Sequence, residues 1–448
     1  MMKNFLYFLA VFLLSSFGIS SLANAEKNEP NHEIVLGVDR EAIYGPLLKG
    51  KKVALMVNQS SINKDERHTI DKLLSEQKAY NFKVTKLFSV EHGIRGDEDA
   101  GFGDNDHVDS QSGLPIISLY GRDEAGRSRA HPTAEQLQDV DIVIYDLQDV
   151  GVRFFTYTIS MHHLLESLQK YNKEFMVFDR PNPLGDKVYA PLLEEKFISG
   201  IGMHPIPMVH GLTSGEFALM IVNEGWLTNG NDTSWQAHGQ AEYQFPADKL
   251  HVIPMANYQH GMPYHLPRAP SPNLRTDLSI KLYPSLALFE ATSVNMGRGS
   301  TQPFEQLGFS SDKFYENISY TVDINQEKYG WPQAGKQVYG ESLTHLDEKS
   351  IKPTISHFTK WWFKFHENGY PLAIEADKEV QYLKYQNDYF VIRPLWLAKL
   401  VGNQQFLTML NESIEKGLSQ EQTIDLIEQK WREQNQDYLK LRDKYKLY

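Results

Sequence analysis

The first half of the chain alternates short apolar runs with segments of helical spacing. The apolar runs lie at 51–58, 83–90, 115–120, 141–148 and 174–180, and the helical segments at 68–77, 133–138 and 158–171. Strands that are apolar throughout and alternate with helices are typical of a mostly parallel sheet covered on both faces. We therefore expect an α/β, Rossmann-like N-terminal domain, in which Thr133 is placed to cap the short helix at 133–138.

The pattern changes after about residue 225. A helix is expected to begin at 213–216, and the later loop at 260–277 is rich in Gly, Pro, Asn and His, as connections between domains often are. Beyond it, helices are predicted at 279–292, 358–369, 403–417 and 419–441, with few strands. We predict a Rossmann-like domain that carries the chemistry at 26–257 and a smaller α+β domain at 258–448 that completes a cleft. A chain of 448 residues with 41% hydrophobic content is large enough for two such domains.

The N-terminus has the pattern of a cleavable secretory signal peptide. Lys3 precedes an uncharged apolar run at 5–17, and residues 23–25 read Ala-Asn-Ala, a small-x-small cleavage site. An uncleaved anchor is the alternative, but the run is short for crossing a bilayer. We therefore expect residues 1–25 to be removed, and the mature chain to act in the periplasm or outside the cell without a stable membrane anchor.

Composition narrows the choice of chemistry. The chain has no cysteine, which excludes disulfides, a thiol nucleophile, thiolate metal sites and a lipid-modified cysteine. Its formal net charge of −12 argues against nucleic acid or an anionic membrane surface as the main partner. The sequence leaves the oligomeric state open.

Polar residues follow the ends of four predicted strands. In open α/β sheets ligands bind outside the carboxyl ends of the strands, so we expect these clusters to converge on one rim. They are Asn58 and Gln59 after the first strand, Glu91 and His92 after the second, Asp146, Gln148 and Asp149 after the fourth, and Asp179, Arg180 and Asn182 after the fifth.

Several common sites are missing from the sequence pattern. The turn after the first strand contains no G-x-G-x-x-G, and no G-x-x-x-x-G-K-[ST] occurs, which argues against a nucleotide cofactor. The histidines show no H-E-x-x-H spacing, and no serine lies in G-x-S-x-G. We expect neither a cofactor nor a metal, and serine esterase chemistry is disfavoured.

Glu91 is the favoured acid. Glycoside hydrolysis needs a carboxyl group that protonates the leaving oxygen and a second group at the anomeric carbon. Burial at the end of an apolar strand is a condition that can raise the pKa of a carboxyl group toward this role. The alternative is a structural ion pair with Arg95 or Arg153. Asp146 or Asp149 could face Glu91 across the rim, although one of them could instead cap the helix near Thr156.

Other polar residues are candidates for binding, each with a structural alternative. Arg180 and Asn182 lie in a proline-rich loop and could hold sugar hydroxyls or a carboxylate, or could form only an internal ion pair. His210 precedes a helix start, where an anion could bind, or is an ordinary loop histidine. Arg298, in the loop 297–305, has a planar fork that suits a carboxylate, unless Phe304 anchors that loop structurally. Glu290 is a further carboxylate candidate, with a helix-end ion pair as its alternative.

A series of blocks along the chain resembles one known family. VALMVNQSS, LFSVEHGIRGDEDAG, IYDLQDVGVRFFTYTISM, FDRPNPLG, HGLTSGEFA, PSPNL, GRGSTQPFEQLG and RDKYKLY occur in the order typical of exo-β-N-acetylmuramidases of the NamZ type. The resemblance runs from about residue 35 to the C-terminus. The segment 292–296 departs from the family's usual form, which weakens any role transferred to that loop.

The resemblance implies a glycoside hydrolase that removes terminal N-acetylmuramic acid from the non-reducing end of peptidoglycan fragments. Its substrates would be muropeptides or MurNAc-GlcNAc oligosaccharides, with Glu91 as the family's natural catalytic candidate and Asn273 of the PSPNL block among the binding residues. The second group would be Asp146, Asp149, Glu216 or the substrate's own N-acetyl group. The lactyl carboxylate of muramic acid would explain a need for Arg95, Arg153, Arg180 or Arg298. A peptidoglycan-binding protein without catalysis is the alternative.

Overall fold

The computed structural model describes residues 33–95, 106–227, 245–376 and 389–448. The signal peptide expected at 1–25 lies outside these residues. No helix within the described ranges is long and apolar enough to cross a membrane.

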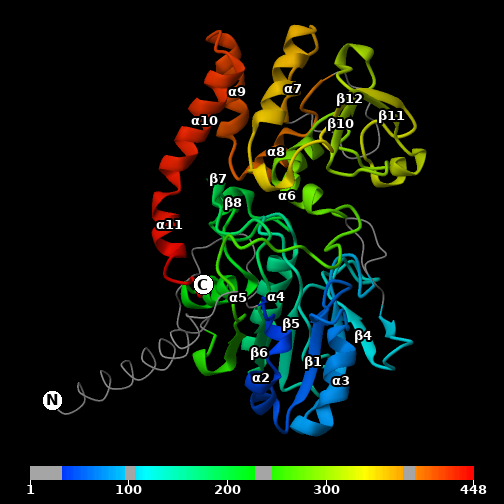
Figure 1. Ribbon diagram of the computed structural model, residues 1–448, viewed down its shortest axis with the longest axis vertical. Helices are drawn as coiled ribbons and strands as arrows, with labels where there is room; N and C mark the ends of the chain where they lie inside the picture. The colour runs from blue at the N-terminus through cyan, green and yellow to red at the C-terminus, as the bar shows by residue number, and fades with distance from the viewer. Residues whose placement is uncertain (1–32, 96–105, 228–244, 377–388) are drawn as a thin grey trace, which may run out of the picture.

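A seven-stranded sheet forms the centre of the N-terminal half (Figure 1). Its strand order is β3-β4-β2-β1-β5-β6-β9, and all neighbours are parallel except β3 and β4. The strands are β1 (Lys52–Val57), β2 (Lys83–Ser89), β3 (His107–Val108), β4 (Pro115–Ser118), β5 (Ile142–Asp146), β6 (Glu174–Phe178) and β9 (Leu250–Ile253). The expected α/β class with a mostly parallel sheet is confirmed.

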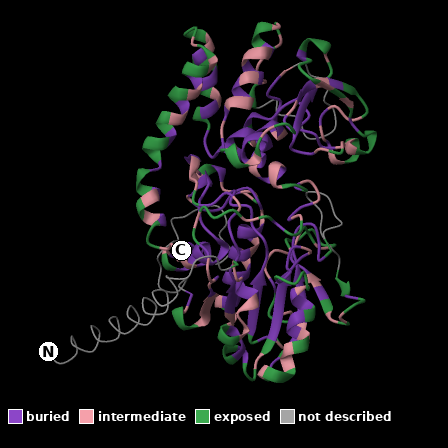
Figure 2. Ribbon diagram, in the orientation of Figure 1, coloured by how far each residue is buried: buried purple, intermediate pink, exposed green. Residues whose placement is uncertain are grey.

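Helices cover both faces of this sheet, which is why its central strands are buried (Figure 2). Along β1, Val53, Leu55 and Val57 pack in one apolar cluster with residues of α2 (Glu41–Leu48) and α3 (Thr69–Tyr80). The alternate residues Ala54 and Met56 pack in a second cluster with residues of α4 (Tyr157–Lys170) and α5 (Ser214–Asn223). The period of two along the strand therefore divides the core into two layers.

The predicted elements match the structure in most places. All five apolar runs form strands. The structure adds β9, which was not predicted and lies between the change of pattern at about residue 225 and the loop at 260–277. The helix predicted at 133–138 is wrong: the segment forms turns. Thr133 does accept the Gln136 N–H at 3.3 Å, as a helix cap would. The segment before β5 is too short, however, for a helix to extend beyond its first turns.

The C-terminal half combines helices with a small antiparallel sheet, as expected of an α+β unit. The sheet has the order β10-β12-β11, and a separate hairpin, β7-β8, lies between β6 and α5 in the sequence. Its strands are β10 (Gln306–Phe309), β11 (Ile318–Thr321) and β12 (Gln337–Ser342), and the hairpin is β7 (Tyr189–Leu192) and β8 (Pro207–Val209). The helices are α6 (Asp277–Leu286), α7 (Ser356–Glu367), α8 (Pro394–Val401), α9 (Gln405–Glu415), α10 (Gln420–Gln434) and α11 (Gln436–Arg442).

The last two helices return to the N-terminal half. The single helix expected at 419–441 is broken at Asn435, whose Nδ2 donates to the Ala190 carbonyl at 2.9 Å. From there α11 descends beside the N-terminal half, and the C-terminus ends near α5 (Figure 1). Tyr438 donates its hydroxyl hydrogen to the His210 carbonyl at 2.7 Å. The end of the chain therefore ties the second half to the loops at the rim of the sheet.

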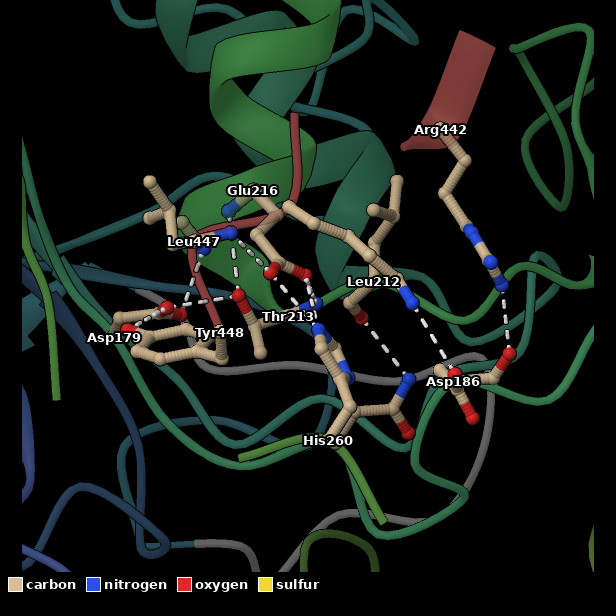
Figure 3. Close-up of polar contacts among 12 residues, drawn as sticks. Asp179, Asp186, Leu212, Thr213, Glu216, His260, Arg442, Leu447 and Tyr448 are labelled. Atoms are coloured by element: carbon tan, nitrogen blue, oxygen red, sulfur yellow. Dashed lines mark hydrogen bonds and ion pairs between the residues drawn. The ribbon is translucent and has the colours of Figure 1, made fainter. Parts of the chain in front are cut away.

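The final residues cover two buried carboxylates (Figure 3). The Leu447 N–H donates to Glu216 Oε1 at 2.8 Å, and the Tyr448 hydroxyl donates to Asp179 Oδ2 at 2.8 Å. Lys446 pairs with Asp186 at 3.1 Å. Burial, followed by the charge of Glu216, raises the pKa of Asp179 from 3.8 to about 6.

Removal of the terminal hydroxyl tests this contact. In Tyr448→Phe, Asp179 loses a buried donor, and the Met255 N–H that donates to the same hydroxyl at 2.8 Å loses its acceptor. We expect the free energy of unfolding, measured in urea, to fall by about 1–3 kcal/mol. Tyr445→Phe is the control, because its hydroxyl contacts Glu224 nearer the surface, and its loss should be smaller. An equal fall in the free energy of unfolding in the two variants would contradict a larger stabilisation by the Tyr448 hydroxyl.

The raised pKa of Asp179 predicts a pH dependence of stability. The folded state holds this proton more tightly than the unfolded chain, so its stabilisation is complete below pH 4 and is lost as pH rises through 6. A rise from 3.8 to about 6 corresponds to about 3 kcal/mol. Urea unfolding of the wild type and Asp179→Asn should therefore show a stability difference that shifts by about this amount between pH 4 and 7, to the disadvantage of the wild type. A difference that is constant with pH would refute the assignment.

Candidate active site

The rim of the large sheet has a topological switch point between β1 and β5. From β1 the strand order continues to β2 and β4 on one side, and from β5 to β6 and β9 on the other. Loops diverge at such a point and leave room for a ligand at the carboxyl ends of the strands. Asn58 follows β1 there and donates from Nδ2 to the Tyr157 hydroxyl at 2.7 Å.

Asn58 and Gln59 attach the long connecting loop to this rim. The Tyr157 hydroxyl donates to the Pro270 carbonyl at 2.9 Å, and Gln59 Nε2 donates to the Ala269 carbonyl at 3.0 Å. The structure thus gives both residues contacts with the protein itself. Their expected role in binding substrate stays a prediction, and Asn273 lies in the same loop with its N–H 3.4 Å from Ser271 Oγ.

Asp146 is held in a buried ion pair with Arg180. Arg180 Nε donates to Asp146 Oδ1 at 2.5 Å, and Nη2 donates to Oδ2 at 2.9 Å and to the Ile62 carbonyl at 2.8 Å. Thr69 Oγ1 also donates to Oδ2. Asp146 is fully buried and Arg180 is 3% exposed. This geometry gives Asp146 and Arg180 a structural role. The catalytic role expected of Asp146 and the binding role expected of Arg180 stay predictions.

Glu216 and Asp179 are likewise occupied by the protein. Glu216 accepts from the Thr213 N–H at 2.9 Å in a capping box at the start of α5, from His260 Nε2 at 2.9 Å, and from the Leu447 N–H. Asp179 accepts from the Thr213 hydroxyl and the Gly215 N–H, each at 2.8 Å. Both are fully buried, so the structure gives them a structural role. The catalytic role expected of Glu216 and the binding role expected of Asp179 stay predictions.

Gln148 and Asn182 also turn toward backbone groups. Gln148 Nε2 donates to the carbonyls of Asp149 and Pro181, each at 2.8 Å. Asn182 Nδ2 donates to the Leu212 carbonyl at 3.0 Å, and its Oδ1 accepts the Leu184 N–H at 2.9 Å. These contacts shape the loops behind the rim, and the expectation that the two amides bind sugar stays a prediction.

Arg153 connects the two halves of the chain. Its guanidinium donates to the carbonyls of Ile206 at 2.8 Å, Leu400 at 2.9 Å and Pro191 at 3.2 Å, and it pairs with no carboxylate among the described residues. It is 1% exposed, and burial lowers its pKa to about 9. Arg153 therefore has a structural role between the two halves, and the expected contact with substrate stays a prediction.

Arg95 is the most exposed of the four candidate arginines. Its side chain is 37% exposed and pairs with Asp109 at 2.7 Å. Hydrogen bonds from Ser112 and this pairing hold the pKa of Asp109 below its usual value, against the effect of burial. Burial lowers the pKa of His68, and the positive charge of Arg95 lowers it further. His68 Nε2 lies 2.9 Å from the Asn58 carbonyl, which places Arg95 near the rim.

Glu91 lies at the rim, just beyond the end of β2. The residue is 8% exposed, and Thr156 donates its hydroxyl hydrogen to Oε2 at 2.5 Å. The next residue, His92, has a φ of 72°, a left-handed conformation that is uncommon for a residue with a side chain. Such backbone strain concentrates at functional sites.

Asp149 and His210 form a second polar group at the rim. Asp149 Oδ1 accepts the Gly151 N–H at 2.6 Å and lies 3.8 Å from His210 Nε2. The backbone brings the two residues together, since the His210 N–H donates to the Gly151 carbonyl at 3.3 Å. The expectation that Asp149 could cap a helix near Thr156 is wrong, because no side chain caps α4.

Two buried tyrosines have raised pKa values, to which the charges of the acidic groups at the rim contribute. Burial, then Glu91 and more weakly Asp149, raises the pKa of Tyr157 well above its usual value. Burial and the charges of Glu290, Glu91 and Asp149 do the same for Tyr283, opposed by Arg298. Tyr283 belongs to α6, so residues of both halves converge here. The sequence contained no signal for Tyr283, whereas Tyr157 and Thr156 could have been found from their place in the polar segment after β5.

Arg298 is packed in an aromatic box in the second half. Its Nη2 donates to Glu290 at 3.0 Å, and its guanidinium carbon lies 4.0 Å from the Trp331 ring centroid and 5.0 Å from that of Phe304. The ion pair expected as the alternative for Glu290 is therefore present. Phe304 also anchors the loop, as the structural alternative required.

No group of three or more His, Cys, Asp or Glu side chains within the described part of the chain could hold a metal ion. The rim carries two carboxylates, Glu91 and Asp149, and the imidazole of His210. Most glycoside hydrolases cleave the glycosidic bond with two carboxyl groups in different surroundings.

Comparisons with known proteins identify the family of this chain. Residues 53–278 match the family described as "Exo-beta-N-acetylmuramidase NamZ, N-terminal", and residues 281–448 match its C-terminal counterpart. The chain is 30% identical over 448 residues to the peptidoglycan β-N-acetylmuramidase NamZ of Bacillus subtilis strain 168, covering 97% of each protein.

Two crystal structures of DUF1343 family proteins from Bacteroides fragilis NCTC 9343 share the fold. One is 32% identical with a TM-score of 0.72, over 93% of this chain and 99% of that one. The other is 24% identical with a TM-score of 0.69, over 94% of this chain and 100% of that one, and it supports the fold alone. With both family domains matched in order along nearly the whole chain, this protein belongs to the NamZ family of exo-β-N-acetylmuramidases.

Proposed function

We propose that this protein removes terminal N-acetylmuramic acid from the non-reducing end of peptidoglycan fragments, with Glu91 as the catalytic acid. The observation that carries the assignment of the site is the position of Glu91 and Asp149 after β2 and β5, the two strands that flank β1 beside the switch point, with Thr156 of the segment after β5 hydrogen-bonded to Glu91. The substrate follows from the NamZ relative, whose name describes a peptidoglycan β-N-acetylmuramidase.

Glu91 suits the acid role because it is partly shielded and oriented. The residue is 8% exposed, and the Thr156 hydroxyl donates to one oxygen of its carboxylate. Of the three carboxylates considered as its partner, Asp146 and Glu216 are saturated by contacts with the protein. Asp149 is the remaining one and lies on the same rim.

The lactyl carboxylate of muramic acid needs a cation within reach. Arg95 is the best placed of the four arginines considered, since its side chain is 37% exposed and those of Arg180 and Arg298 are 2% and 6% exposed. The guanidinium of Arg153 donates to backbone carbonyls instead. We assign Arg95 to the lactyl group, so that substrates lacking it should bind more weakly.

Export would bring the enzyme to this substrate. The charged start, apolar run and Ala-Asn-Ala sequence of residues 1–25 favour a cleaved signal peptide. We propose that the mature chain begins near Glu26 and acts in the periplasm or outside the cell on muropeptides or MurNAc-GlcNAc oligosaccharides.

Replacement of the acid tests the proposal. Glu91→Gln keeps the shape of the side chain and removes its proton, so the release of N-acetylmuramic acid from a MurNAc-GlcNAc disaccharide should slow by about 10²–10⁴-fold in kcat. Disaccharide binding, measured by calorimetry, should persist. Glu412→Gln is a matched control, because Glu412 pairs with Lys416 on an exposed face of α9, and it should leave kcat unchanged. Unchanged turnover in Glu91→Gln would remove Glu91 from the role.

A further inference from the structure

A buried acceptor and a buried donor lie beside each other at the rim. Asp149 Oδ2 and His210 Nε2 each have no hydrogen-bond partner in the described part of the chain. The residues are 7% and 1% exposed, and the Asp149 Oδ1 to His210 Nε2 distance of 3.8 Å is too long for a hydrogen bond. Buried polar atoms are rarely left without partners, so both atoms call for an explanation.

The protonation of His210 follows from its other nitrogen. The Leu212 N–H donates to His210 Nδ1 at 3.2 Å, so Nδ1 is the acceptor and the ring hydrogen is on Nε2. The ring is stacked on Phe217, with centroids 5.4 Å apart, and the His210 carbonyl accepts from Tyr438. The Nε2–H direction is therefore fixed by contacts on three sides of the residue.

One kind of ligand satisfies both atoms at once. An oxygen that carries a hydrogen can donate to Asp149 Oδ2 and accept from His210 Nε2–H, whereas a carboxylate or an ammonium group can satisfy only one of them. Water and a sugar hydroxyl share this chemistry. Asp149 follows β5 and Glu91 follows β2, the two strands that pair with β1, so both residues lie at the same rim.

We propose that Asp149 and His210 together hold the water that attacks the anomeric carbon, with Asp149 as general base and His210 as its positioning residue. This inference rests on the proposed function, since it supplies the partner of Glu91. His210 fixes the water through one lone pair, and Asp149 aligns one of its hydrogens. A second lone pair of the water then faces the sugar.

The step balances with no further reactant. As the water oxygen bonds to the anomeric carbon, one of its protons moves to Asp149, and the bond from that carbon to the glycosidic oxygen breaks. The bonding electron pair stays on the leaving oxygen, which takes the proton of Glu91. Exchange with solvent then returns a proton to Glu91 and removes one from Asp149. Attack opposite the leaving group inverts the anomeric carbon, so a β-linked substrate gives α-N-acetylmuramic acid first.

Product stereochemistry tests the inference on the unaltered enzyme. Proton NMR during hydrolysis of the MurNAc-GlcNAc disaccharide should show the α-anomer of N-acetylmuramic acid before mutarotation. The β-anomer as first product would overturn the role of Asp149 as base. Because this measurement needs no variant, it remains decisive whatever a substitution does to folding.

Rescue by azide tests the two residues themselves, with an aryl β-N-acetylmuraminide as substrate. Such a leaving group needs little protonation, so Glu91→Gln should be slowed much less than on the disaccharide, whereas Asp149→Asn should be slowed by about 10²–10⁴-fold in kcat with KM nearly unchanged. Azide needs no base, and it should restore turnover of Asp149→Asn and yield the α-glycosyl azide. Asp123→Asn, which alters an exposed ion pair with Arg127, should match the wild type.

His210→Phe keeps the stacked ring and removes the Nε2–H donor. We expect kcat to fall about 10-fold or more, with partial recovery in azide, a response that a purely structural loss would not show. A raised KM with unchanged kcat and no effect of azide in both variants would mean that the pair binds a sugar hydroxyl, and would overturn the assignment to water. Loss of activity in Glu91→Gln alone would likewise overturn this inference and leave the proposed function standing.

Discussion

The rim of the sheet depends on the buried ion pair between Asp146 and Arg180. It joins the end of β5 to the residue that follows β6, and Thr69 and the Ile62 carbonyl bring the loop after β1 into the same contact. Removing two charges from water is costly and is offset only when nearly every donor and acceptor is used, as happens here. This pair connects the ends of β1, β5 and β6 on both sides of the switch point. It therefore also positions the loops that follow these strands.

The saturation of that pair explains where the chemistry can lie. Carboxylates that hold the fold together have their oxygens committed to donors, as Asp146 and Glu216 do. Asp149, three residues beyond Asp146, keeps one oxygen without a donor among the described residues. Asp146 and Asp149 are close in sequence but differ in their hydrogen-bond partners. Asp146 therefore maintains the structure, and Asp149 is available for reaction.

The second half of the chain completes this arrangement from outside. Tyr283 comes to the rim from α6, Tyr438 supports the His210 carbonyl from α11, and the terminal Tyr448 contacts Asp179. Arg153 adds a contact to the end of α8 through the Leu400 carbonyl. The last residues of the chain are therefore part of the support of the site, although they lie far from it in sequence.

The sequence predicted the sheet well because its strands are buried on both faces and are apolar throughout, as in β1 and β5. It also predicted which residues follow the strands, but not their partners. Asp146 and Arg180 both seemed free for substrate, since nothing in the sequence tells that residues 34 positions apart form a bidentate pair. Arg153 could not be predicted for a related reason: its acceptors are backbone carbonyls, which carry no signature in the sequence.

The measurement that tests the central claim most directly is a crystal structure of Glu91→Gln with the MurNAc-GlcNAc disaccharide bound. The account predicts the glycosidic oxygen within hydrogen-bond distance of the residue 91 side chain. It also predicts a water oxygen between Asp149 Oδ2 and His210 Nε2, facing the anomeric carbon. A disaccharide bound away from the β1–β5 switch point, or one oriented with its glycosidic bond away from residue 91, would contradict the account.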